Sequence, residues 1–260
     1  MNFSAGRVFL DGAPSSLTAG IMSWGFRKRL ARAIIIDRAT PGSISLIGRV
    51  ARERTEENYR FASRFVAGKS VLDIGGGTGI GHDLLVAGGA ASILSLDRHL
   101  ASTTQGGDAR VRSVRGDFLT YPLPDGEFDV VICLGTLFYL EDTDAALAKM
   151  HRLLKPGGTL VINCINQRLV RRYFEMPLEE IDGKFSTAYD EAGFRAFLKS
   201  RFDSEPELYV QQPVPVSRSL SDMFRFWLTP ATWPLRRHPV VPRRPGTEGM
   251  YVYAVVNKKG

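Results

Sequence analysis

Short apolar runs alternate with segments of helical spacing through the middle of the chain. The strand-like runs lie at residues 69–75, 92–97, 111–117, 127–135 and 157–164. They are apolar without regular alternation, so both faces of each strand should be buried. Before the last run, apolar residues from Leu147 to Leu154 follow helical spacing and end at Lys-Pro-Gly-Gly. This order predicts an α/β fold with a mostly parallel, doubly wound sheet and helices on both faces.

The first run leads into a loop with five glycines, in the stretch "VLDIGGGTGIG" from Val71 to Gly81. Glycine costs roughly 0.5–1 kcal/mol relative to alanine inside regular structure, so such a cluster indicates a turn whose backbone must approach another group. Ligands of doubly wound sheets bind beyond the carboxyl ends of the strands, where the strand order reverses. We therefore expect a ligand at Gly75 to Gly81.

The spacing within this loop excludes several nucleotide ligands. The Gly-x-Gly pairs that begin at Gly75 and Gly77 both lack the third glycine of a dinucleotide fingerprint. A phosphate loop would need Lys and Ser/Thr where His82 and Asp83 stand. Asp73, two residues before the first glycine, would repel a pyrophosphate but suits a ligand that carries an ammonium and a sulfonium group.

Four motifs in order resemble the class I S-adenosylmethionine-dependent methyltransferases, in particular their small-molecule group. They are "VLDIGGGTG", "SLDRH", "GDFLTYPLPDGEFDVVIC" and "LLKPGGTLVI", and together they cover about residues 68–164. The resemblance implies a Rossmann-like sheet of seven strands, mostly parallel, with an antiparallel last strand. It also implies S-adenosylmethionine as cofactor, S-adenosylhomocysteine as product, and no metal.

Asp97 is the second acid that the sequence singles out. It ends the second run 24 residues after Asp73, about one strand-helix-strand unit, and a carboxylate there can accept both ribose hydroxyl groups. By resemblance, the backbone of Gly75 and Gly77 approaches the methionine part of the cofactor. Asp73 then holds the cofactor's ammonium, either directly or through the loop, and Arg98 follows the adenosine edge.

The resemblance assigns further contacts beyond the third and fourth runs. Asp117 would accept the adenine amino group and Phe118 would cover the ring, although a turn acid beside a core phenylalanine explains the pair equally. Leu134 would present backbone near the methionine end. On the acceptor side, Tyr139 stands where many relatives have histidine, so a histidine base is in doubt and a core aromatic is the alternative.

The regions outside the motifs should determine the acceptor. We expect a helical N-terminal lid over residues 1–66, with helices at 22–36 and 49–66 and Tyr59 as a cofactor contact. The methyltransferase domain would span residues 67–260, with acceptor-side insertions at about 165–200 and 211–249. The second insertion interrupts a closing antiparallel hairpin and mixes aromatic residues with arginine. That mixture suits a buried cap, a membrane interface or an anionic acceptor.

Charge and cysteine usage narrow the compartment and the partners. The net charge is +7, with eight basic and two acidic residues in each of the segments 1–52 and 211–260. A generic nucleic-acid binder would carry a basic stripe within its folded core, whereas here the basic residues lie in the two terminal segments. This distribution favours some other anionic partner for these segments, or their charge serves solubility alone. No apolar run approaches a membrane span, so we expect a cytoplasmic protein, with peripheral contact at the inner membrane face as an option. Cys133 and Cys164 are expected to be buried, reduced thiols.

The sequence therefore predicts an S-adenosylmethionine-dependent methyltransferase that methylates an oxygen of a small molecule or saccharide, anionic or lipid-linked. Two alternatives stay open. A nucleic-acid methyltransferase would explain the basic flanks, but the Asp/Asn-Pro-Pro-aromatic motif is absent after the fourth run. A non-catalytic cofactor-binding protein would keep Asp73 and Asp97 without turnover.

Overall fold

The structure is a computed structural model. It describes residues 46–100, 104–105, 107–174, 189–215, 239–244 and 247–260. The helix expected at residues 22–36 and most of the aromatic and basic insertion expected at 211–249 lie outside these residues.

Within the described residues, nine strands form one sheet in the order β3-β4-β2-β1-β5-β6-β9-β7-β8. The long strands are β1 (Ser70–Ile74), β2 (Ser92–Asp97), β4 (Val111–Arg115), β5 (Phe128–Cys133), β6 (Leu154–Ile165), β7 (Glu207–Pro215) and β9 (Thr247–Asn257). Strands β4, β2, β1, β5 and β6 run parallel, and β9 pairs antiparallel with both β6 and β7. The predicted doubly wound sheet and its antiparallel closing hairpin are confirmed.

The sheet has nine strands in this description where seven were predicted. The additional strands are β3 (Thr104–Gln105) and β8 (Val241–Pro242), of two residues each, at the two edges of the sheet. An edge strand exposes unpaired backbone groups that a short segment can satisfy without burying an apolar face. Such a segment needs no hydrophobic run, so the apolar pattern could not indicate it.

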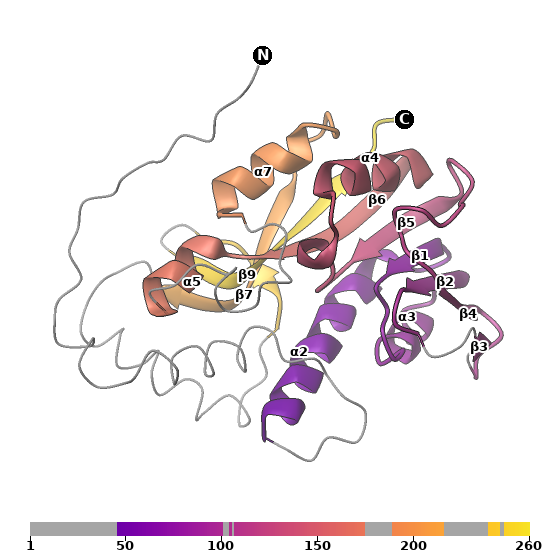
Figure 1. Ribbon diagram of the computed structural model, residues 1–260, viewed down its shortest axis with the longest axis horizontal. Coiled ribbons are helices and arrows are strands. Elements are labelled where there is room, and N and C mark those ends of the chain that lie inside the picture. Colours follow the sequence, from indigo (N-terminus) through magenta and orange to yellow (C-terminus); the bar gives the residue numbers. More distant parts are fainter. Residues whose placement is uncertain (1–45, 101–103, 106, 175–188, 216–238, 245–246) are drawn as a thin grey trace, which may run out of the picture.

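Helices cover both faces of the sheet (Figure 1). Helices α2 (Leu46–Ala62), α3 (His82–Ala87) and α5 (Gln167–Phe174) pack on one face, and α4 (Thr143–Leu153) and α7 (Glu191–Lys199) pack on the other. The 3-10 helices η1 (Ser63–Phe65) and η2 (Leu137–Tyr139) follow α2 and β5. Successive strand residues alternate between the faces, since Val71 belongs to the α2 side and Leu72 to the α4 side. Burial of one such side chain contributes about 1.5–3 kcal/mol.

Helix α2 connects the N-terminal region to the sheet. Phe61 and Ala62 are buried in the same hydrophobic cluster as the strands. The Tyr253 hydroxyl on β9 lies 2.6 Å from Asn58 Oδ1, and Arg54 donates to the Tyr251 hydroxyl at 3.0 Å. The helix expected at 49–66 is therefore present at 46–62 and packs directly on the domain, while the division of the chain at residue 66 stays a prediction.

Candidate functional site

The strand order reverses between β1 and β5, and the loops after these two strands touch. Strands β2 and β4 extend the sheet on the β1 side, and β6 extends it on the β5 side. Gly75 has a φ of +77°, and a Cβ placed on it would come within 2.1 Å of Thr136 Oγ1. Only glycine fits both the conformation and the space, so the predicted ligand loop closes against the loop after β5.

Gly77 lies at an open part of the same loop. Its φ is +57°, and a Cβ placed on it would have nothing within 4 Å. Its backbone N–H donates to Asp97 Oδ2 at 2.9 Å. The acid at the end of β2 is thus bonded to the glycine loop, and exposed backbone next to a carboxylate offers a cradle in which the ribose and methionine parts of a nucleoside fit.

Asp73 lies beneath the loop and is 1% exposed. The Tyr59 hydroxyl lies 3.0 Å and 3.1 Å from its two oxygens, and Ser95 also hydrogen-bonds to it. A Cβ on Gly76 would come within 2.5 Å of Asp73 Oδ2, so the loop covers the carboxylate directly. Burial raises the pKa of Asp73 to about 7, with Asp97 adding to the effect and the hydrogen bonds from Tyr59 and Ser95 opposing it. A carboxylate covered in this way would act on the cofactor's ammonium through the glycine loop, and not by direct contact.

The ring of Tyr59 packs under the end of the glycine loop. A Cβ on Gly81 would come within 2.1 Å of ring atom Cγ, and the residue is 4% exposed. Burial raises the pKa of Tyr59, and the neighbouring Asp73 raises it further. Tyr59, which the sequence predicted as a cofactor contact, therefore lies behind the loop, and its hydroxyl group donates to Asp73.

His82 begins α3 and brings an imidazole to the same buried acid. Its Nε2 atom lies 3.7 Å from Asp73 Oδ2 and has no hydrogen-bond partner among the described residues. Burial lowers the pKa of His82. The sequence gave no sign of this approach, because it depends on how the intervening glycine loop folds.

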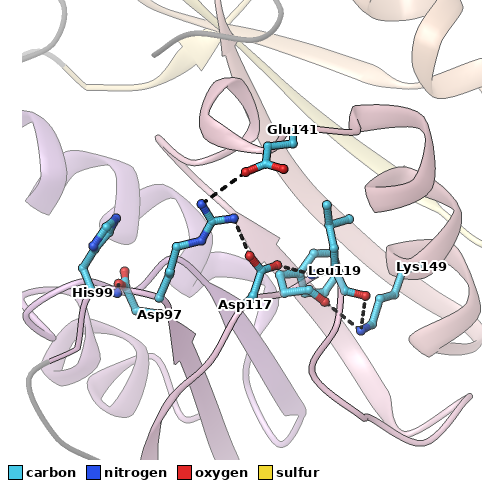
Figure 2. Close-up of polar contacts among 8 residues, drawn as sticks. Asp97, His99, Asp117, Leu119, Glu141 and Lys149 are labelled. Atoms are coloured by element: carbon cyan, nitrogen blue, oxygen red, sulfur yellow. Dashed lines mark hydrogen bonds and ion pairs between the residues drawn. The ribbon is translucent and has the colours of Figure 1, made fainter.

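Arg98 and Asp117 form an ion pair that links the ends of β2 and β4 (Figure 2). Arg98 Nη1 also lies 3.7 Å from Glu141 Oε1. The other Asp117 oxygen, Oδ1, accepts a hydrogen bond from the Leu119 backbone at 2.8 Å. The structure thus brings Asp97, Arg98 and Asp117 together at the carboxyl ends of β2 and β4, while their contacts with a cofactor stay a prediction.

The remaining predicted residues lie in more enclosed surroundings. Phe118 is 4% exposed and belongs to the core cluster on the α4 face, in place of an open stacking position. Leu134 is 7% exposed, and its carbonyl oxygen accepts a hydrogen bond from Thr136 at 3.3 Å. Tyr139 lies in η2, with its ring 4.8 Å from the ring of Phe138. Leu134 directly follows β5, and its role near the methionine end of a cofactor stays a prediction.

Clusters of metal-binding side chains and the two cysteines are further features that could form a site. In the part of the chain that the structure describes, no group of three or more His, Cys, Asp or Glu side chains could hold a metal ion. Cys133 and Cys164 are buried free thiols, as predicted. Burial raises the pKa of the thiol of each, which makes both unreactive at neutral pH.

Comparisons with known proteins identify a methyltransferase domain in this chain. Residues 72–162 match the family model described as a methyltransferase domain. A probable S-adenosylmethionine-dependent methyltransferase of Mycolicibacterium smegmatis is 32% identical over 143 residues, which are 50% of this chain and 55% of that protein. A ubiquinone biosynthesis O-methyltransferase of Pseudomonas paraeruginosa is 33% identical over 110 residues, 39% of this chain and 47% of that protein. The chain thus spans about half the length of these curated relatives.

A solved structure shares the fold. A SAM-dependent methyltransferase from Thermotoga maritima superposes with a TM-score of 0.55 at 19% identity, covering 80% of this chain and 92% of that one. The domain match covers β1 to β6, which carry the glycine loop, Asp97 and Asp117. Residues 72–162 therefore form a methyltransferase domain, which is similar to that of S-adenosylmethionine-dependent methyltransferases.

Proposed function

We propose that the protein transfers a methyl group from S-adenosylmethionine to a hydroxyl oxygen of a small molecule. The observation that carries the proposal is the bond from the Gly77 backbone to Asp97 beside open space at the switch point of the sheet. An acid that is already fixed to the loop needs no rearrangement to receive ribose hydroxyl groups.

The chain's own residues would hold the cofactor in the following way. Asp97 accepts the ribose hydroxyl groups, and Asp117 accepts the adenine amino group beside Phe118. The backbone at Gly75, Gly77 and Leu134 surrounds the methionine part. Asp73 supports the loop from below with Tyr59, and Arg98 spans the two adenosine-side acids.

Methyl transfer from this cofactor needs little chemistry from the protein. The bound cofactor supplies a methyl carbon activated by a positively charged sulfur. The protein then aligns the acceptor oxygen at attack distance, an effect that can supply on the order of 7–11 kcal/mol. Tyr139, after β5, is our candidate for contact with the acceptor. The name of the Pseudomonas relative, an O-methyltransferase, supports an oxygen acceptor.

A cavity that includes basic side chains is our candidate site for the acceptor. It has a volume of about 460 Å³ and lies past the carboxyl end of β6, beside α7. Its lining includes the basic side chains Arg168, Arg195, Lys199 and Arg243. Three acids of the same lining lie among them, and two of these acids pair with Arg168 and Arg243. Glu205 pairs with both Arg195 and Lys199, so the basic and acidic charges around the cavity balance. A carboxylated or phosphorylated aromatic or saccharide, free or lipid-linked, would therefore bind there by replacing Glu205 as the partner of Arg195 or Lys199.

Membrane contact stays a proposal. Among the residues that the structure describes, no helix is both long enough and apolar enough to cross a bilayer. The basic aromatic segment that motivates peripheral contact lies mostly at 216–238, outside the described residues. Sedimentation with anionic vesicles that depends on the arginines of this segment would support peripheral contact of a cytoplasmic protein with the inner membrane face.

Calorimetry with S-adenosylhomocysteine tests the cofactor site. Wild type should bind one equivalent, and Asp97→Asn should lose about tenfold or more in affinity because it loses a charged acceptor. Asp108→Asn is the matched control, since Asp108 pairs with Arg110 at the far end of β4. Absence of binding by wild type, or an unchanged affinity in Asp97→Asn, would overturn the proposal.

Turnover with matched acceptors tests the reaction. A dihydroxybenzoic acid and its neutral methyl ester differ in one charge, and the acid should be the better methyl acceptor. Cofactor binding without transfer to any hydroxylated acceptor would favour a non-catalytic binder. Methylation of RNA with steep salt dependence would favour a nucleic-acid enzyme instead.

A further inference from the structure

Lys149 is a buried lysine on α4 whose ammonium group bonds to backbone oxygens. The residue is 8% exposed. Its Nζ atom lies 2.7 Å from the carbonyl oxygen of Phe118, 2.6 Å from that of Tyr121 and 3.3 Å from that of Leu119. An ammonium has three donors, and this turn supplies three acceptors. Figure 2 shows Lys149 beside Leu119 of this turn. Because a buried charge is costly unless it is satisfied, the interaction fixes α4 and the turn relative to each other.

The same turn carries Asp117, which organises it from the other side. Asp117 Oδ1 accepts a hydrogen bond from the Leu119 backbone at 2.8 Å, and the Asp117 carbonyl accepts from the Tyr121 backbone at 2.7 Å. The backbone N–H groups of the turn therefore donate to Asp117, while the backbone carbonyl groups of the turn accept from Lys149. A shift of the carbonyl groups would move the Asp117 carboxylate with them.

The second anchor of Asp117 is more exposed. The Arg98 side chain is 43% exposed and Glu141 is 81% exposed, so water and salt screen that ion pair. The Lys149 ammonium also lies 5.1 Å from the centre of the buried Phe118 ring, which shields it further. Lys149 is thus the less exposed of the two anchors of this turn.

We propose that Lys149 is a positioning residue that sets the base selectivity of the cofactor site. It holds the 117–121 turn so that the Asp117 carboxylate meets the exocyclic amino group of adenine. A base with a carbonyl group at that place, as in hypoxanthine, would set an acceptor against the carboxylate and bind less well. The inference rests on the proposed function, because it presupposes that Asp117 faces adenine.

The test compares S-adenosylhomocysteine with its analogue in which hypoxanthine replaces adenine, by calorimetry. Wild type should prefer adenine by about tenfold or more, the effect of one hydrogen bond to a charged group. Lys149→Met should reduce this preference to less than about threefold while its affinity for the hypoxanthine analogue stays within about threefold of wild type. Lys155→Met is the control, because Lys155 bonds to Asp129 at the opposite end of the sheet and should keep the full preference.

The outcomes separate the two proposals. A wild type that binds neither compound overturns the proposed function and this inference together. A wild type that prefers adenine, with a Lys149→Met variant that keeps that preference or loses both affinities by the same factor, overturns the role of Lys149 alone. If Lys149→Met does not fold, Lys149→Gln provides the test, since its shorter neutral side chain should also reduce the preference, and a full preference there would overturn the inference.

Discussion

The Tyr59 hydroxyl group lies 3.0 Å from one carboxylate oxygen of Asp73 and 3.1 Å from the other. The two residues are buried, and they join α2 to the end of β1 beneath the glycine loop. Gly76 lies over Asp73 and Gly81 over Tyr59, each so closely that a Cβ would clash. Helix α2 therefore supports the glycine loop from below through this hydrogen-bonded pair, in addition to the bond between Gly77 and Asp97.

Tyr59→Phe should weaken both the fold and the cofactor site. The ring stays, but Asp73 loses its buried donor, which should lower the free energy of unfolding by about 1–3 kcal/mol. Urea unfolding measures this loss, and S-adenosylhomocysteine affinity should fall with it. Tyr209→Phe is the control, because its hydroxyl bonds to Glu207 at the surface and its removal should cost less than about 0.5 kcal/mol. Equal losses in the two variants would contradict the importance of the Tyr59–Asp73 pair.

The raised pKa of Asp73 predicts a specific pH dependence of stability. Burial raises the pKa from 3.8 to about 7, so the folded protein holds a proton that the unfolded chain releases. The stability that this group contributes is full below pH 3.8 and is lost as pH rises through 7. The free energy of unfolding of wild type should thus decline relative to that of Asp73→Asn between about pH 4 and pH 7, by at most about 4 kcal/mol.

Denaturant unfolding of both proteins at half-unit pH steps measures this difference. The groups that face Asp73 are Tyr59 from α2, Asp97 from β2, His82 from α3 and Cys133 from β5. His82, whose pKa burial lowers, titrates in both proteins and acts in the opposite direction. A difference that stays constant across the range would show that Asp73 is ionised throughout.

Local patterns predicted the strands and the loop, whereas contacts between distant segments were not predictable. Asp73 and Asp97 end apolar runs, and glycine clusters are visible in any sequence. The Tyr59–Asp73 bond depends on how α2 packs, and Phe118 faces the core because α4 covers that side. Lys149 did leave a signal, since it falls on the face of α4 that Ala146, Met150 and Leu153 bury. A lysine on an apolar helical face indicates a buried amine that needs hydrogen-bond acceptors, but the helical spacing does not show which residues supply them.

Gly77 and Gly126 offer a matched test of the open cradle. Both have positive φ angles, +57° and +64°, and a Cβ on either would have nothing within 4 Å. Gly77→Ala and Gly126→Ala should therefore cost similar amounts of stability, about 1 kcal/mol each from backbone strain alone. Only Gly77→Ala adds a methyl group to the space beside Asp97 where the cofactor is expected.

The two variants should thus differ in binding and not in stability. Gly77→Ala should lower the affinity for S-adenosylhomocysteine by about tenfold or more, because a well-packed ligand cannot share its space with a methyl group without strain of about 1–3 kcal/mol. Gly126→Ala should bind as wild type does. Thermal unfolding and calorimetry on the same samples provide both quantities. If Gly77→Ala kept wild-type affinity at an equal loss of stability, the cofactor would have to lie elsewhere along the sheet edge.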